Sequence, residues 1–177
     1  MRKTDLPPDQ IKTSVLAYLE ERFGLGPGLF SGYGFYLASK GRVYLGPGHS
    51  IPKPRIVTIG LLAARVNGSI KPTTNLLQAF GKDVKKSRIS LTKDQTLSYA
   101  KGEDITLTNP GAGVQASAVS GSGSSVPSDG YVLLEYEGHP LGCGLLKDGT
   151  IKNMLPGKAR STIHRPCRTR CPHASSG

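Results

Sequence analysis

The 177-residue sequence has no tryptophan, three cysteines and no long apolar run. No run approaches the roughly 20 apolar residues that a membrane helix needs, and the first residues lack the apolar core of a signal peptide. We therefore expect a cytoplasmic protein with no membrane partner. An odd cysteine count, with two cysteines near the C-terminus, argues against a disulfide framework and fits a reducing compartment.

Acidic residues are also scarce, at 12 against 23 lysines and arginines, so the formal net charge is +11. No acid follows Asp148, whereas six cations do: Lys152, Lys158, Arg160, Arg165, Arg168 and Arg170. Such an asymmetric excess favours a polyanionic partner, most often nucleic acid, because neutralising phosphates releases counterions. The alternative is a solvated surface that like charge keeps soluble.

Glycine and proline are plentiful, with 23 and 13 residues, which favours many short strands and turns over a helix bundle. Pro7-Pro8-Asp9 predicts the start of a helix that ends at Gly24. Its apolar stripe is most simply a face that docks on the following domain, and the alternative is an amphipathic helix for a partner protein. The stripe is Ile11, Val15, Leu19 and Phe23.

Later segments predict further short elements. We expect a hairpin over 35–45, a turn at Asn67-Gly68, a short helix over 75–80 and a helix over 93–101 with a capping box from Thr92 and Gln95. The lysine-rich segment Lys82, Lys85, Lys86 and Arg88 is either a phosphate-contact loop or merely solvated. Residues 108–129, rich in Gly, Ser and Ala, predict a flexible loop between two paired strands.

The stretch from Gly130 to Arg160 is the most informative. It predicts two apolar strands over 131–136 and 141–146, with a turn at 137–140 and another at Lys147-Asp148-Gly149. We expect these strands to place Lys152, Asn153, Lys158 and Arg160 along one edge of a sheet, as a surface for an anion. Asn153 has an alternative role, in which its amide pairs with a buried backbone group.

This stretch, with its Pro-Leu-Gly-Cys-Gly, Lys-Asp-Gly and Lys-Asn-x-x-Pro-x-x-x-Arg segments, resembles the PUA-like RNA-binding domain of RsmF-type RNA cytosine-5 methyltransferases of the NOL/NOP/Sun family. Residues 91–105 resemble the helix and Gly-Glu turn that precede it. The resemblance implies an α+β fold, a PUA-like mixed β-barrel with flanking helices, here as a stand-alone protein. We expect residues 1–30 to form a docking helix and linker, 31–160 the PUA-like domain, and 161–177 a basic disordered tail.

The resemblance implies binding of structured ribosomal or transfer RNA, in ribosome assembly or RNA modification. The predicted contacts are Lys152, Asn153, Lys158, Arg160, Lys82, Lys85, Lys86, Arg88, Arg165, Arg168 and Arg170. Two alternatives remain open: a stable ribosome component, and a non-catalytic subunit that assists an RNA methyltransferase catalytic subunit in trans. Tyr33, Tyr36 and Tyr44 either stack on bases or pack in the core.

Catalytic chemistry is not expected, because no βαβ alternation with a glycine-rich first turn is present to bind a methyl-donor cofactor. We therefore expect no cofactor and no enzymatic activity. Cys143, between two glycines on a predicted strand, is most simply a small buried hydrophobe. His164, Cys167, Cys171 and His173 could ligate zinc but are too closely spaced for known zinc folds, so a basic tail is the preferred interpretation.

Overall fold

A computed structural model describes residues 8–48, 60–107 and 129–155. Helix α1 (Pro8–Phe23) carries Asp9 in its first turn, and the chain leaves it through Gly24, whose φ is +68°. Its predicted stripe is buried, with Ile11, Val15, Leu19 and Phe23 between 0 and 3% exposed. Each such side chain contributes roughly 1.5–3 kcal/mol when removed from water. The stripe therefore docks α1 on its own chain, as predicted.

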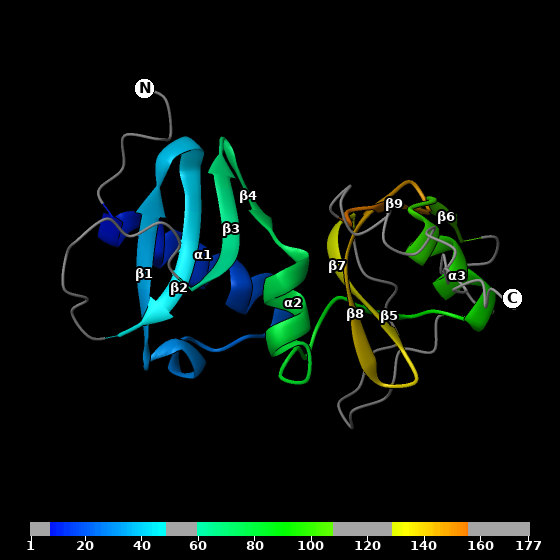
Figure 1. Ribbon diagram of the computed structural model, residues 1–177, viewed down its shortest axis with the longest axis horizontal. Coiled ribbons are helices and arrows are strands. Elements are labelled where there is room, and N and C mark those ends of the chain that lie inside the picture. Colours follow the sequence, from blue (N-terminus) through cyan, green and yellow to red (C-terminus); the bar gives the residue numbers. More distant parts are fainter. Residues whose placement is uncertain (1–7, 49–59, 108–128, 156–177) are drawn as a thin grey trace, which may run out of the picture.

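The first sheet is antiparallel and has four strands in the order β1-β2-β3-β4. Strands β1 (Tyr33–Ala38) and β2 (Arg42–Pro47) form the predicted hairpin around a short 3₁₀ turn, η3 (Ser39–Gly41). Another 3₁₀ turn, η2 (Pro27–Phe30), precedes them. Strands β3 (Leu61–Asn67) and β4 (Ser69–Pro72) turn at Gly68, whose φ of +72° suits a tight hairpin. Helix α1 covers one face of this sheet (Figure 1).

The second sheet is mixed, with the order β5-β7-β8-β9-β6, and curls into a half-barrel (Figure 1). Its strands are β5 (Arg88–Ser90), β6 (Ile105–Thr106), β7 (Gly130–Tyr136), β8 (His139–Lys147) and β9 (Thr150–Asn153). Strands β5 and β7 pair in parallel, whereas the other described strand pairs of this sheet are antiparallel. Helix α3 (Lys93–Lys101) starts with the predicted Thr92–Gln95 capping box and covers the inner face. The chain is thus α+β, as predicted.

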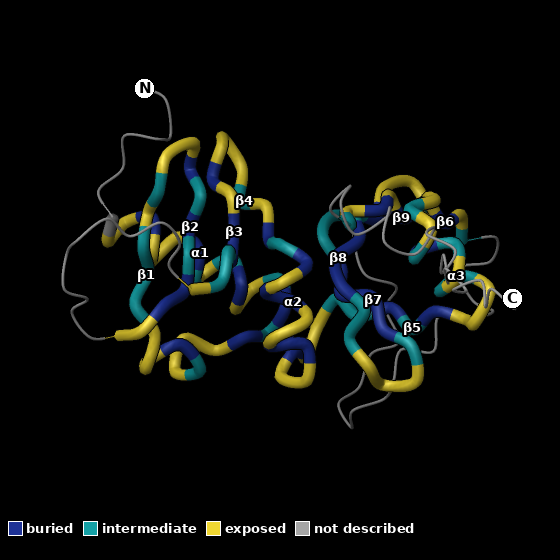
Figure 2. The backbone as a smooth tube through the Cα atoms, in the orientation of Figure 1, coloured by how far each residue is buried: buried dark blue, intermediate teal, exposed yellow. Residues whose placement is uncertain are grey.

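The two sheets share a continuous apolar junction. Helix α2 (Thr74–Phe80) packs against β3 of the first sheet and β8 of the second. The apolar core beneath the first sheet continues past α2 to Leu133 of β7 and Cys143 of β8, both fully buried. Gly81 is needed here, because a Cβ at this position would lie 2.4 Å from the Cβ of Pro140. Figure 2 shows buried stretches where α2 approaches β8.

Two local predictions were wrong. The turn between β7 and β8 needs only Glu137 and Gly138, both with positive φ, so β8 begins at His139 and not at Leu141. The segment 108–129 was expected between paired strands, but β6 pairs with β9 while β7 pairs with β5 and β8. Residues 108–128 themselves lie outside the described ranges. The predicted boundaries at residues 30 and 160 remain predictions.

Candidate nucleic-acid interface

The segment Lys82–Arg88 connects α2 to β5 and so joins the two sheets. Its backbone is anchored, because the N–H groups of Lys85 and Lys86 both donate to the carbonyl of Phe23, at 2.8 and 3.1 Å. Val84 is buried beneath it at 1% exposure. The side chains of Lys82, Lys85 and Lys86 are exposed. An anchored backbone therefore presents three ammonium groups to solvent, with Asp83 as the acid among them.

Arg88, which was predicted as a phosphate contact, has a role inside the fold. Its guanidinium forms an ion pair with Glu135 of β7, and its Nε donates to the same carboxylate oxygen at 3.1 Å. The Ser90 hydroxyl donates to the other carboxylate oxygen at 2.9 Å, and Arg88 also donates to the Val84 carbonyl. Glu135 is only 1% exposed. Arg88 is thus the counter-ion of a buried carboxylate.

Lys152 and Asn153 are neighbours on β9 but point to opposite faces of the sheet, as successive strand residues do. Lys152 is exposed, whereas Asn153 is buried in the inner core. The Asn153 amide donates to the carbonyls of Tyr99 and Glu103 at 2.6 and 3.2 Å, and its oxygen accepts from the Leu155 N–H at 2.9 Å. The geometry therefore supports the second interpretation of Asn153, in which its amide pairs with buried backbone groups.

A second lysine that the sequence analysis missed shares the Lys152 face. Lys147 of β8 pairs with Thr150 of β9, which lies two residues before Lys152 on the same face. This placement could have been predicted from the sequence, because the two residues that flank a two-residue Asp-Gly turn pair with each other. Lys147 is exposed. Both lysines therefore belong to the outer face of the half-barrel.

The expected single edge is only partly realised. Strand β9 is not an outermost strand, since β6 pairs with Thr150 and Ile151, and the Asp104 carboxylate accepts from the Asn153 N–H at 2.8 Å. In Figure 1 the segment after α2 lies at the lower side of the molecule, and β9 lies at the upper end of the second sheet. Within the described ranges, the lysines of the Lys82–Arg88 segment and the pair Lys147 and Lys152 thus form two separate groups. The predicted contacts Lys158, Arg160, Arg165, Arg168 and Arg170 lie outside the described residues.

The described part of the chain shows no assembled catalytic or metal centre. Cys143 is fully buried, and burial raises the pKa of its thiol to about 12, so it is protonated and unreactive at neutral pH. Residues 8–48, 60–107 and 129–155 contain no group of three His, Cys, Asp or Glu side chains placed to hold a metal. His164, Cys167, Cys171 and His173 lie outside these ranges. Among the helices of the described ranges, none has the length and apolar character of a membrane span.

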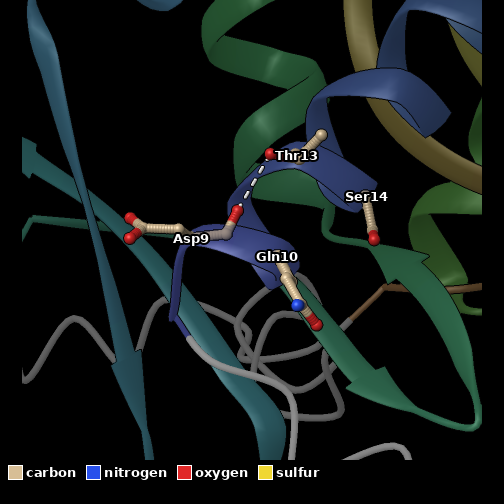
Figure 3. Close-up of a pocket in the computed structure, with 4 residues that line it drawn as sticks. All are labelled: Asp9, Gln10, Thr13 and Ser14. Carbon is tan, nitrogen blue, oxygen red and sulfur yellow. Dashed lines mark hydrogen bonds between the residues drawn. The ribbon is translucent and has the colours of Figure 1, made fainter.

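One hollow lies on α1, lined by Asp9, Gln10, Thr13 and Ser14 (Figure 3). All four residues are exposed, and the Thr13 hydroxyl donates to the Asp9 carbonyl at 2.9 Å. The side chains point away from one another in Figure 3, so they do not converge on a bound group. This hollow offers an acid and no cation, and it is unsuited to a phosphate.

The burial of Cys143 predicts a pH dependence. Because its folded pKa is about 12 against an ordinary value of 9.0, the stabilisation is complete below pH 9 and is lost as the pH rises toward 12. We expect the free energy of unfolding to fall by about 1.4 kcal/mol per pH unit in this window. Urea titrations at pH 8, 9 and 10 measure it. In Cys143→Ala the decline between pH 9 and 10 should disappear, and an unchanged decline would contradict this cause.

Residues 86–161 match the family model described as the methyltransferase RsmF PUA domain. This segment is therefore similar to the PUA domain of RsmF-type methyltransferases. The match covers less than half of the 177 residues and starts immediately before β5, so it includes the whole half-barrel and excludes the first sheet. No curated protein matches the chain.

The match confirms the predicted PUA-like domain of the RsmF type, and it is to a PUA domain and not to a catalytic domain. A PUA domain of this origin is associated with RNA binding in the context of RNA modification. Of the two lysine groups, the outer-face pair Lys147 and Lys152 lies within the matched segment, while the anchored segment from Lys82 runs up to its first residues.

Proposed function

We propose that this protein binds structured ribosomal or transfer RNA through its RsmF-type PUA domain, in ribosome assembly or RNA modification, and that it catalyses no reaction itself. The observation that carries the proposal is the anchored Lys82–Arg88 segment, which presents three exposed lysines at the start of a PUA domain. RNA helices expose phosphates and 2′-hydroxyls in a shallow minor groove, so rigidly placed lysines on a folded surface suit them. We place the protein in the cytoplasm as part of this proposal.

The test is a salt-dependent titration of the full chain with a ribosomal RNA hairpin. Replacing Lys82, Lys85 and Lys86 together by glutamine should weaken binding at least tenfold and reduce the slope of log K against log salt by about 2–3, since each phosphate contact releases roughly 0.7–0.9 counterions. The matched control is glutamine at three exposed lysines elsewhere: Lys12, Lys40 and Lys93. Equal effects of the two triple variants would reject the proposed surface.

A second candidate function is a non-catalytic subunit that presents RNA to a methyltransferase, because the matched PUA domain derives from methyltransferases. The purified chain with S-adenosylmethionine and RNA should then show no methyl transfer, but should raise the RNA affinity of a separate catalytic subunit.

A stable ribosome component is distinguished from an assembly factor by co-sedimentation. The stable component should stay on mature ribosomal subunits in high salt, whereas an assembly factor should dissociate.

A further inference from the structure

The first sheet carries a row of three positive residues that lies outside the matched domain. Arg42 of β2 pairs directly with Arg65 of β3, and Arg65 pairs directly with Lys71 of β4. Paired residues on neighbouring strands point to the same face, with Cβ atoms about 4.5–5.5 Å apart. The row therefore crosses three strands and extends over about 10 Å, twice the spacing between strands.

This row lies on the face that α1 does not cover. The alternate residues Val43, Ala64 and Val66 are buried in the core that contains α1, whereas Arg65 and Lys71 are exposed. Neither has a carboxylate partner among the described residues. The sequence contains no acid at all between Glu21 and Asp83. Like charges in direct register destabilise a sheet, so the row costs stability unless an anion neutralises it.

Two tyrosines lie beside the row on the same face. Tyr36 and Tyr44 are a cross-strand pair two positions along the strands from the Ala38–Arg42 pair, and residues two apart on a strand share a face. The Tyr36 ring lies over Gly34, because a Cβ at Gly34 would come within 2.9 Å of the ring, and its hydroxyl donates to the Pro47 carbonyl at 2.7 Å. The ring is thus held along the sheet, and both tyrosines are half-buried. Aromatic rings beside cations on an open sheet are suited to stacking unpaired bases.

We propose that this face, defined by Arg42, Arg65, Lys71, Tyr36 and Tyr44, binds a single-stranded segment of RNA. The cations contact its phosphates, and the tyrosines stack on its bases. Charge complementarity selects a polyanion, and the adjacent aromatic pair selects a nucleic acid over an acidic protein. The inference rests on the proposed RNA binding but assigns a second surface, so that the PUA domain holds a folded part of the RNA and the sheet holds an unpaired flank.

The test uses the full chain and a fluorescent oligouridine of about ten nucleotides, a length typical of single-strand sites. Arg42 is left intact, since its guanidinium donates to the Ser39 carbonyl and hydroxyl and holds the β1–β2 turn. Arg65→Gln with Lys71→Gln should weaken binding about tenfold and reduce the salt slope by about 1.4, twice the value for one single-strand phosphate. The melting temperature should not fall, because removing a like-charge pair does not destabilise the sheet.

The charge-matched control is Lys93→Gln with Lys101→Gln on α3, which should change oligouridine affinity less than about twofold because it leaves the sheet intact. Tyr44→Leu, which keeps apolar bulk but removes the stacking surface, should weaken binding roughly fivefold or more. Equal losses of affinity in the Arg65→Gln/Lys71→Gln variant and in the Lys93→Gln/Lys101→Gln control would overturn the proposal. Displacement of oligouridine by equally charged oligoglutamate at equal concentration would overturn it too. Loss of hairpin binding only in the Lys82/Lys85/Lys86 variant, with oligouridine binding retained, would separate the two surfaces.

Discussion

Arg88→Ala should lower the free energy of unfolding by about 3–5 kcal/mol, because it removes the counter-ion of a buried carboxylate. Glu135 is 1% exposed, and Arg88 donates to it from two nitrogens. Without the guanidinium, the Glu135 carboxylate would still accept the hydrogen bond from the Ser90 hydroxyl, but no positive charge of Arg88 would lie beside it. Urea unfolding of the full chain, followed by circular dichroism, measures the change.

Two further variants separate the ion pair from simple loss of packing. Arg88→Met with Glu135→Leu removes both charges and should recover most of the lost stability, since replacing a buried pair by apolar groups is often neutral. Lys86→Ala, two residues earlier and exposed, should change stability by less than about 0.5 kcal/mol. If Arg88→Ala left stability intact but weakened RNA binding tenfold, Arg88 would be a phosphate contact after all.

Asn153→Ala should cost about 2–4 kcal/mol of stability, because it removes a buried amide with several partners. The carbonyls of Tyr99 and Glu103 would lose this donor, and the Leu155 N–H would lose its acceptor. These bonds join β9 to the end of α3, so hydrogen exchange should become faster in both elements. Thermal melts and exchange mass spectrometry measure the two effects.

The adjacent residue provides the control. Lys152→Ala lies on the same strand but on the exposed face, and it should leave the melting temperature within about a degree or two while weakening RNA binding. Of these two neighbouring substitutions, Asn153→Ala should thus lower stability, whereas Lys152→Ala should lower the affinity for RNA. A loss of RNA affinity in a fully folded Asn153→Ala protein would contradict the structural role.

Much of the local structure could be predicted because it depends on neighbouring residues. The spacing of Ile11 and Val15, the Thr92–Gln95 capping box and the Asn67-Gly68 turn each specify an element within a few positions, and all are found. The direction of Lys152 likewise follows from strand alternation. These features need no knowledge of the rest of the chain.

The rest depends on contacts between distant parts of the chain. In the sequence, Arg88 cannot be distinguished from the other cations of its basic segment. Its partner Glu135 is 47 residues later in the sequence, and only the pairing of β5 with β7 brings the two together. The Arg42–Arg65–Lys71 row likewise could not be predicted from the sequence, because it depends on the pairing register of three strands. Periodicity assigns a face within a strand but does not align different strands.

Photocrosslinking of the full chain to a 4-thiouridine-labelled ribosomal RNA hairpin, followed by peptide mass spectrometry, tests the central claim most directly. The account predicts crosslinks in the Lys82–Arg88 segment and around Lys147 and Lys152, lost when salt is raised. Crosslinks confined to α1 and α3, or a yield independent of salt, would contradict RNA binding through these surfaces.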